Sequence, residues 1–142
     1  MFRNALVSVS DKTGLLDFIK PLAEKGTRIV STGGTAKFLS DNGVEVVQVS
    51  EQTGFPEVMD GRVRTLHPLI HMALLGRRTN PEDMSLLAKH GIEPFDLVVG
   101  SLYPFEEQKN KNLSDQDLVE YIDIGGPALL RAASKNFSAI TV

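Results

Sequence analysis

The stretch T-R-I-V-S-T-G-G-T-A-K, Thr27 to Lys37, decides the fold of this chain. A short β-branched run at 28–30 leads into two adjacent glycines, and residues 35–42 can form a helix. Glycine lets a backbone adopt positive φ and approach a ligand where a side chain would forbid it. We therefore expect a strand, a tight glycine loop and a helix in succession.

The same alternation of apolar runs and helical stretches continues along the whole sequence. The predicted strands cover residues 5–9, 28–30, 44–49, 97–99 and 139–142. The predicted helices cover residues 14–25, 35–42, 81–90, 114–121 and 127–135. Nearly continuous apolar runs are typical of strands that are covered on both faces. The pattern predicts an α/β fold, in which a parallel sheet forms the middle of a three-layer sandwich.

The composition of the chain limits the classes of function that we expect. The 142 residues, 42% apolar and 23% charged, are expected to form one soluble domain over 1–142. A net charge of −3 gives no reason to expect nucleic acid or a membrane surface as partner. The absence of cysteine excludes disulfides and thiolate chemistry. No signal peptide or membrane span is evident, so a cytoplasmic location is expected. Because the chain ends inside a predicted strand, we expect a C-terminally truncated piece of a longer protein.

The glycine loop is in the right place to hold an anion. In parallel α/β sheets, ligands bind beyond the carboxyl ends of the strands, where loop N–H groups and the positive end of a helix converge. Ser31, Thr32 and Thr35 add hydroxyl groups. The spacing fits neither the Walker loop nor the dinucleotide fingerprint. A phosphate monoester is the better interpretation, and a tight turn with Thr35 as helix cap is the alternative.

Two further segments carry polar residues at a predicted strand end or helix start. In D-L-V-V-G-S-L-Y-P-F, Asp96 to Phe105, a buried strand runs into Ser101 and Tyr103. In I-D-I-G-G-P-A-L-L-R-A-A-S-K, Ile122 to Lys135, two glycines precede a helix and Asp123 lies just upstream. Rim packing of Tyr103 and an ordinary helix start with surface charges are the respective alternatives.

The block G-F-P-E-V-M-D-G-R-V-R-T-L-H-P, Gly54 to Pro68, is a long polar loop, and such loops tend to be functional. Arg62 and Arg64 occupy alternate positions, so an extended backbone would point both toward one phosphate or carbonyl oxygen. His67 and His71 are four residues apart, but no third ligand accompanies them. We therefore expect no metal site.

Together these motifs, with S-V-S-D-K-T-G near the start, resemble one family. It is the N-terminal IMP cyclohydrolase part of the bifunctional purine-biosynthesis protein that also carries AICAR transformylase. The likeness covers nearly the whole chain and implies a methylglyoxal-synthase-like fold. The transformylase domain has no counterpart in these residues.

The resemblance also implies a reaction. The amide nitrogen of 5-formamidoimidazole-4-carboxamide ribotide closes a ring with loss of water and yields inosine 5′-monophosphate, without metal or redox cofactor. The implied partners are this purine nucleotide precursor, its product and a second copy in a homodimer. A methylglyoxal synthase-type lyase and a nucleotide- or phosphate-binding regulatory domain of the same fold are the alternatives.

Position by position, the resemblance assigns roles to residues of this chain. Residues that would hold the 5′-phosphate are Ser10, Lys12, Ser31, Thr32, Gly33, Gly34 and Thr35. Residues that would line the substrate or face its base are Arg62, Thr65, Ser101, Gly125 and Gly126. The implied catalytic residues are Arg64, Tyr103, Asp123 and Lys135. Asp123 would orient or deprotonate the carboxamide, while Tyr103 and Lys135 would assist proton transfer and stabilise the oxyanion.

Three positions depart from the family pattern. The family usually has lysine at Arg64, asparagine at Ser101 and two glycines at Met72–Ala73. Arginine keeps the positive charge but does not lose its proton, so we expect oxyanion stabilisation at Arg64 in place of proton transfer. These departures are expected to change the rate of the reaction and not its kind.

Overall fold

The structure, a computed structural model, describes residues 1–142 and is built on one parallel sheet. The strands are β1 (Asn4–Ser8), β2 (Arg28–Ser31), β3 (Val47–Gln48) and β4 (Leu97–Gly100). Their order in the sheet is β3-β2-β1-β4, and every neighbouring pair is parallel. The carboxyl ends of all four strands therefore meet at one edge, as the sequence pattern predicted.

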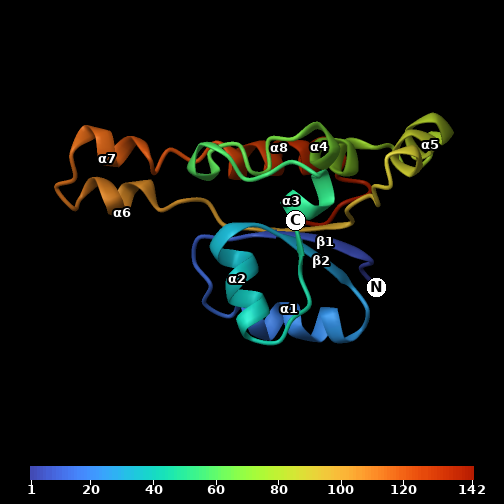
Figure 1. Ribbon diagram of the computed structural model, residues 1–142, viewed down its shortest axis with the longest axis horizontal. Helices are drawn as coiled ribbons and strands as arrows, with labels where there is room; N and C mark the ends of the chain where they lie inside the picture. The colour runs from blue at the N-terminus through green and yellow to red at the C-terminus, as the bar shows by residue number, and fades with distance from the viewer.

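Helices cover both faces of the sheet, which confirms the predicted α/β architecture. Helices α1 (Leu15–Glu24) and α2 (Gly33–Asp41) lie on one face, and α4 (Pro68–Leu75) and α8 (Gly125–Lys135) lie on the other (Figure 1). The remaining helices are α3 (Val49–Thr53), α5 (Pro81–Lys89), α6 (Phe105–Lys109) and α7 (Asp115–Val119). No helix of the chain combines the length and the apolar content that a membrane crossing needs.

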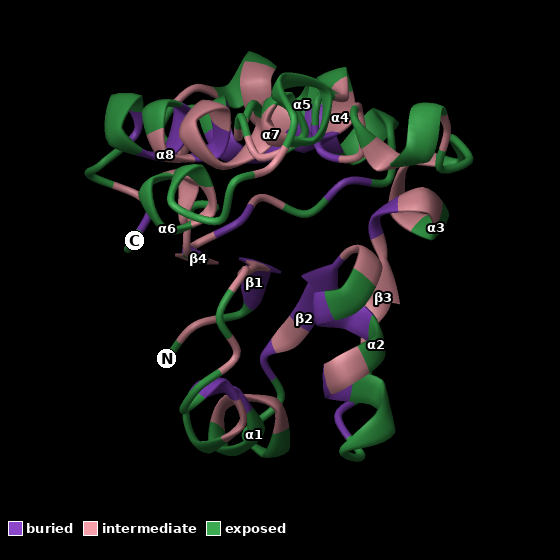
Figure 2. Cartoon of the chain, turned by 90° about the vertical axis from the view of Figure 1, so that its left-hand side faces the viewer, coloured by how far each residue is buried: buried purple, intermediate pink, exposed green.

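Alternation along the strands separates two hydrophobic cores. Leu6 and Val30 point to one face, where they pack in one cluster with residues of α4 and α8. Val7 and Ile29 point to the other face, where they pack with residues of α1 and α2. Figure 2 shows the sheet between the two groups of helices, with β1 and β2 mostly buried. Each fully buried aliphatic side chain contributes about 1.5–3 kcal/mol, so both faces stabilise the sheet.

Two predicted strands are shorter than expected. Only Val47 and Gln48 of the run 44–49 pair in the sheet, and the strand ends there because Gln48 caps α3 in a reciprocal capping box with Glu51. At the other edge, Thr141 forms a single parallel bridge with Leu97. The last predicted strand is therefore present as one paired residue beside β4.

Helix α4 was not predicted, although its start carries clear signals. Pro68 occupies the first turn, where the missing N–H costs nothing. The ring nitrogen Nδ1 of His67 accepts a hydrogen bond from the Leu69 N–H at 3.2 Å and caps the helix. Met72 and Ala73, where the family has glycines, lie inside this helix, and Ala73 is buried in the core.

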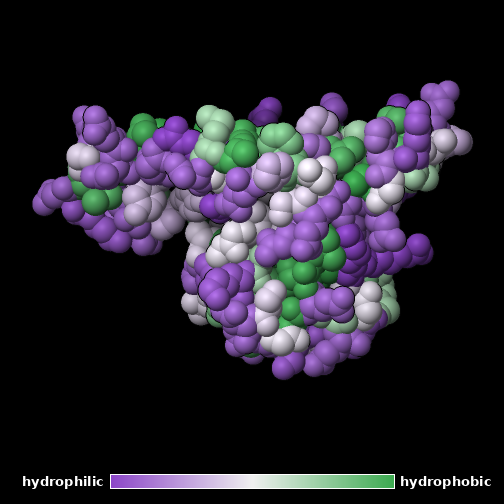
Figure 3. Space-filling model, viewed as in Figure 1, coloured by the Kyte–Doolittle hydropathy of each residue, from purple (hydrophilic) through white to green (hydrophobic).

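The segment that holds α6 and α7 projects from the side of the molecule (Figure 1). Neither helix contains a buried residue. Figure 3 shows mostly hydrophilic side chains over this projection. The chain returns from it to the sheet edge at Ile122–Ile124, next to the end of β4, and this return builds one wall of the site described below.

Candidate active site

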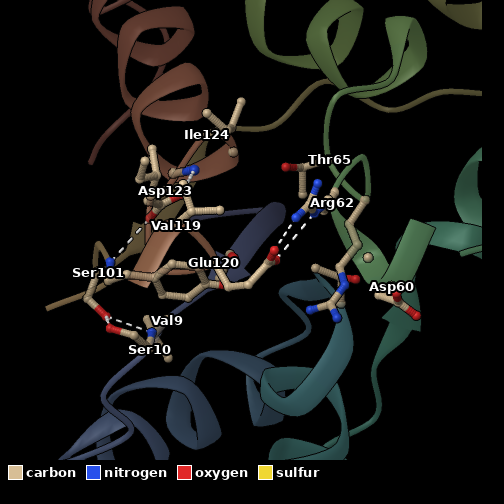
Figure 4. Close-up of a pocket in the computed structure, with 18 residues that line it drawn as sticks. Val9, Ser10, Asp60, Arg62, Thr65, Ser101, Val119, Glu120, Asp123 and Ile124 are labelled. Atoms are coloured by element: carbon tan, nitrogen blue, oxygen red, sulfur yellow. Dashed lines mark hydrogen bonds and ion pairs between the residues drawn. The ribbon is translucent and has the colours of Figure 1, made fainter. Parts of the chain in front are cut away.

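A cavity of about 390 Å³ lies at the carboxyl edge of the sheet (Figure 4). Its volume falls in the range of small-molecule sites. Its walls come from the ends of β1 and β4, the start of α2, the loop before α4, the end of α7 and the start of α8. The structure brings together these predicted site residues at its lining: Ser10, Thr32, Arg62, Arg64, Thr65, Ser101, Tyr103, Asp123, Gly125 and Gly126.

The start of α2 is open to an acceptor from outside the chain. Gly33 is the first helical residue and has a φ of +56°, a conformation that favours glycine. The cap residue, Thr32, makes no side-chain hydrogen bond to the helix, so the first N–H groups have no side-chain acceptor. Gly34 has open space around it and no positive φ. The predicted need for glycine thus applies at Gly33 and not at Gly34.

Two hydroxyls predicted to bind phosphate face into the fold. Ser31 is fully buried and its Oγ donates to the Val7 carbonyl at 2.7 Å. Thr35 Oγ1 donates to the Val9 carbonyl at 3.0 Å and accepts from the Val9 N–H at 3.3 Å. The structure therefore differs from the expectation: both hydroxyls tie the glycine loop to the end of β1.

The two predicted lysines lie outside the cavity lining. Lys12 Nζ donates to the carbonyl of Ser10 at 3.3 Å, which places the ammonium group near the rim. Lys135 is exposed at the last residue of α8, whereas the cavity contacts the first residues of that helix. The 11-residue helix separates them by about 16 Å. A single chain does not bring Lys135 to the cavity.

The loop before α4 reaches the cavity by turns and not as an extended segment. Met59, Asp60 and Gly61 all have positive φ, between 52° and 83°. The predicted parallel fork of Arg62 and Arg64 is therefore wrong in its geometry, although both side chains line the cavity. Strained backbone of this kind persists where surrounding structure holds it, and it is concentrated at functional sites.

Each arginine of this loop pairs with its own carboxylate. Arg62 Nε lies 3.3 Å from Glu120 Oε2, and a second bond joins the same two side chains (Figure 4). The pKa of Arg62 is raised above its ordinary value, mainly by the hydrogen bond to Glu120 and next by the negative charge of Glu120. Arg64 Nε lies 2.5 Å from Glu57 Oε1. The guanidinium of Arg64 lies so close to Gly33 that a Cβ there would overlap it.

At the start of α8, a carboxylate of the chain itself accepts a hydrogen bond from a backbone N–H of the helix. Asp123 Oδ1 accepts a hydrogen bond from the Gly126 N–H at 2.7 Å, and Oδ2 accepts one from the Tyr103 N–H at 3.2 Å. A Cβ at Gly126 would lie 2.5 Å from Asp123 Oδ2 and 2.6 Å from Leu102, so glycine is required for this close approach. Each carboxylate oxygen keeps a lone pair that can accept from a ligand.

Two serines connect the loop after β1 to the end of β4. Ser101 Oγ accepts from the Ser10 N–H at 2.9 Å and lies 3.1 Å from Ser10 Oγ. Ser10 Oγ donates to the Leu102 carbonyl at 2.8 Å. Ser101 replaces the asparagine of the family pattern. Its hydroxyl is therefore used in hydrogen bonds to Ser10 that hold the cavity wall together.

Several lining residues were not predicted. Glu120 reaches Arg62 across 58 positions of sequence, and no local pattern indicates this pairing. Ile122 and Ile124 are 52% and 57% exposed at the cavity wall. Their position on either side of Asp123, in the motif I-D-I-G-G, was the one available signal. Large exposed apolar side chains beside a carboxylate fit a flat heterocyclic ligand.

Comparison with known proteins identifies the family. The model of the family described as "MGS-like domain" matches residues 14–128. The chain belongs to the MGS-like domain family. It is 55% identical over 141 residues to the bifunctional purine biosynthesis protein PurH of Bacillus subtilis, covering 99% of this chain and 28% of that protein. PurH of Polynucleobacter asymbioticus is 56% identical over 143 residues, covering 100% of this chain and 27% of the relative.

A solved structure shares the fold of this MGS-like domain. The crystal structure of ForH superposes with a TM-score of 0.81 at 33% identity, over 99% of this chain and 72% of that chain. The present chain spans about a quarter of the length of the curated relatives, and it matches their MGS-like N-terminal region. The methylglyoxal-synthase-like fold that the family resemblance implied is confirmed.

Proposed function

We propose that this MGS-like domain is an IMP cyclohydrolase, which closes the ring of 5-formamidoimidazole-4-carboxamide ribotide to inosine 5′-monophosphate. One observation carries the proposal: a single cavity is lined both by Thr32 and Arg64, beside the positive end of α2, and by the fixed carboxylate of Asp123. A nucleotide monophosphate presents a phosphate at one end and a hydrogen-bonding base at the other. The printed name of the PurH relatives supports a role in purine biosynthesis.

The 5′-phosphate is assigned to the start of α2. The N–H groups after Thr32 and the positive end of this nine-residue helix favour an anion. Arg64 adds a full positive charge at the same place, since its guanidinium lies against Gly33. This assignment gives Arg64 the phosphate in place of the oxyanion role expected from the motif.

The reacting groups are assigned to the start of α8. Asp123 accepts a hydrogen bond from the carboxamide N–H and removes a proton as the nitrogen attacks the formamido carbon. Tyr103, which lines the same wall, offers its phenol to the oxyanion and to the departing water. Fixing both groups of one molecule in contact supplies much of the acceleration, since well-oriented intramolecular reactions reach effective molarities of about 10⁵ M or more.

Lys135 takes part in this proposal from a second copy of the chain. Its ammonium group is too far along α8 to reach the cavity of its own chain. In the homodimer that the family resemblance implies, the exposed end of one α8 would approach the cavity of the partner. Lys135 would then stabilise the oxyanion in a site that two chains share.

A direct assay tests the proposed reaction. The purified chain is mixed with the formylated carboxamide ribotide, and inosine monophosphate formation is followed by ultraviolet absorbance against an enzyme-free blank. We expect saturable turnover. Saturable binding of inosine monophosphate without turnover would support a nucleotide-binding domain instead. Formation of methylglyoxal from dihydroxyacetone phosphate would support the lyase alternative.

A further inference from the structure

Arg64 separates two cavities. It lines the cavity described above and also a second one of about 290 Å³, whose wall includes Glu57, Phe55 and His67. Glu57 lines the second cavity and not the first. The carboxylate therefore approaches the guanidinium from the side that faces away from the proposed substrate.

The two edges of the Arg64 guanidinium have different surroundings. A Cβ at Gly33 would overlap Nη1 first, whereas a Cβ at Gly61 would overlap Nε first. Both glycines have positive φ, +56° and +83°. The guanidinium thus lies in a slot between two glycines, with Nη1 toward the start of α2 and Nε toward the loop that carries Glu57.

Glu57 is the anion that lies beside the Nε edge of Arg64. Arg64 Nε is buried and makes no hydrogen bond of good geometry, and Glu57 Oε1, at 2.5 Å, is its ion-pair partner. A guanidinium beside the positive end of a helix is electrostatically unfavourable unless an anion is close. A long side chain also has many rotamers, so one fixed contact is needed to keep it in the slot.

We propose that Glu57 is a positioning residue, which holds the Nε edge of Arg64 so that Nη1 points at a phosphate bound at the start of α2. The inference rests on the proposed function in one respect, namely that the ligand carries a phosphate. Glu57 itself does not contact the ligand. Its effect should therefore be specific for the phosphate and should require Arg64.

The test compares ligands with and without phosphate. Glu57→Gln keeps the side-chain shape and removes the charge. Titrations with inorganic phosphate, inosine monophosphate and inosine are followed by nuclear magnetic resonance. We expect the two phosphate ligands to bind about fivefold more weakly to the variant and inosine to bind unchanged. In turnover, KM should rise while kcat stays the same. Asp83→Asn, which breaks the Arg77–Asp83 pair away from the cavity, is the matched control and should change none of these values.

A double-mutant cycle decides whether Glu57 acts through Arg64. In an Arg64→Ala background, Glu57→Gln should have no further effect on phosphate binding. An equal loss in both backgrounds, or an equal loss for inosine, would overturn the inference. The inorganic phosphate titration separates this result from the fate of the proposed function. A phosphate-specific effect of Glu57 without cyclohydrolase turnover would sink the assigned reaction and leave the positioning role standing.

Discussion

The two glycine pairs of this chain begin helices next to one cavity, which Gly125 and Gly126 line directly and which the start of α2 reaches through Thr32. The two helix starts are used differently. At α2, Gly33 adopts positive φ, the cap residue makes no side-chain bond, and a cation lies beside the helix start. At α8, Asp123 already occupies the helix start through the Gly126 N–H. One helix start is left for an anion from outside, and the other presents an anion of the chain itself.

This difference shows why the same short motif carries two roles. A positive helix end attracts negative charge wherever it occurs. When a carboxylate lies two or three residues upstream, the chain satisfies its own helix and gains a fixed acceptor. When no such carboxylate is present, the site remains available for a phosphate.

Gly33→Ala is expected to have the largest effect. The substitution strains a residue at φ +56° and places a methyl group where the Arg64 guanidinium lies. We expect inosine monophosphate to bind about 100-fold more weakly, measured by calorimetric titration. Gly34→Ala is the matched control, because Gly34 has open space and no positive φ, and it should bind nearly as the native chain does. Equal losses in both variants would contradict the assignment of the phosphate to Gly33.

Asp123→Asn should separate chemistry from binding. The amide keeps the size of the carboxylate but cannot take a proton, so we expect turnover to fall about 100-fold or more. Binding of inosine monophosphate should change by no more than about threefold, since the phosphate contacts stay intact. Because the amide satisfies only one of the two N–H groups on Asp123, thermal unfolding serves as the control for folding. A parallel collapse of affinity would make Asp123 a binding residue.

Mixing two inactive variants tests the shared site. Lys135→Ala should lose most turnover and keep its affinity for inosine monophosphate. When the Lys135→Ala and Asp123→Asn chains are mixed, about a quarter of native turnover should return. Half of randomly paired dimers then contain one chain of each variant, and each such dimer has one intact site out of two. Turnover that survives in Lys135→Ala alone would remove this residue from the mechanism. Absence of recovery from two folded, dimeric variants would place both residues in one chain.

The start of α5 provides a purely structural reference, with the smallest effect on function. Asn80 caps this helix, and Arg77 bonds to Asp83 in its first turn. The side-chain and backbone hydrogen bonds from Arg77 lower the pKa of Asp83 to about 2 from 3.8. A lowered carboxyl pKa stabilises the fold above the unfolded value, and this gain is lost as pH falls through the folded value. Asp83→Asn should therefore unfold at a lower temperature than the native chain at pH 6, with the difference vanishing near pH 2. A constant difference would mean that the pair contributes nothing through its charge.

The alternation of strands and helices was predictable because burial on both faces leaves a strong apolar pattern. The strand at 97–99 shows this. The helix at 81–90 was predictable for another reason, namely the capping residue Asn80 and Pro81 at its start. Helix α4 was missed because its apolar stretch follows a loop rich in glycine and proline. The early end of β3 reflects capping of α3 at Gln48, which places Val49 in the helix despite its β-branched side chain.

For the site, the motifs indicated the right loops and only some of the right atoms. The order of elements in a parallel sheet places the residues after β1, β2 and β4 at one edge, so the cavity was predictable. Whether a hydroxyl faces the cavity or the fold depends on a single backbone turn, and Ser31 turns inward to Val7. The pairs of Arg62 with Glu120 and Arg64 with Glu57 arise from tertiary packing, which no local spacing encodes.

The most direct test of the division between the two helix starts is a titration followed at individual backbone amides. Inorganic phosphate, inosine and inosine monophosphate are added in turn, and the amide resonances of Gly33, Gly34, Gly125 and Gly126 are recorded. We predict that phosphate shifts only the first two, inosine only the last two, and the nucleotide all four. Shifts of Gly125 and Gly126 by phosphate alone would contradict the account.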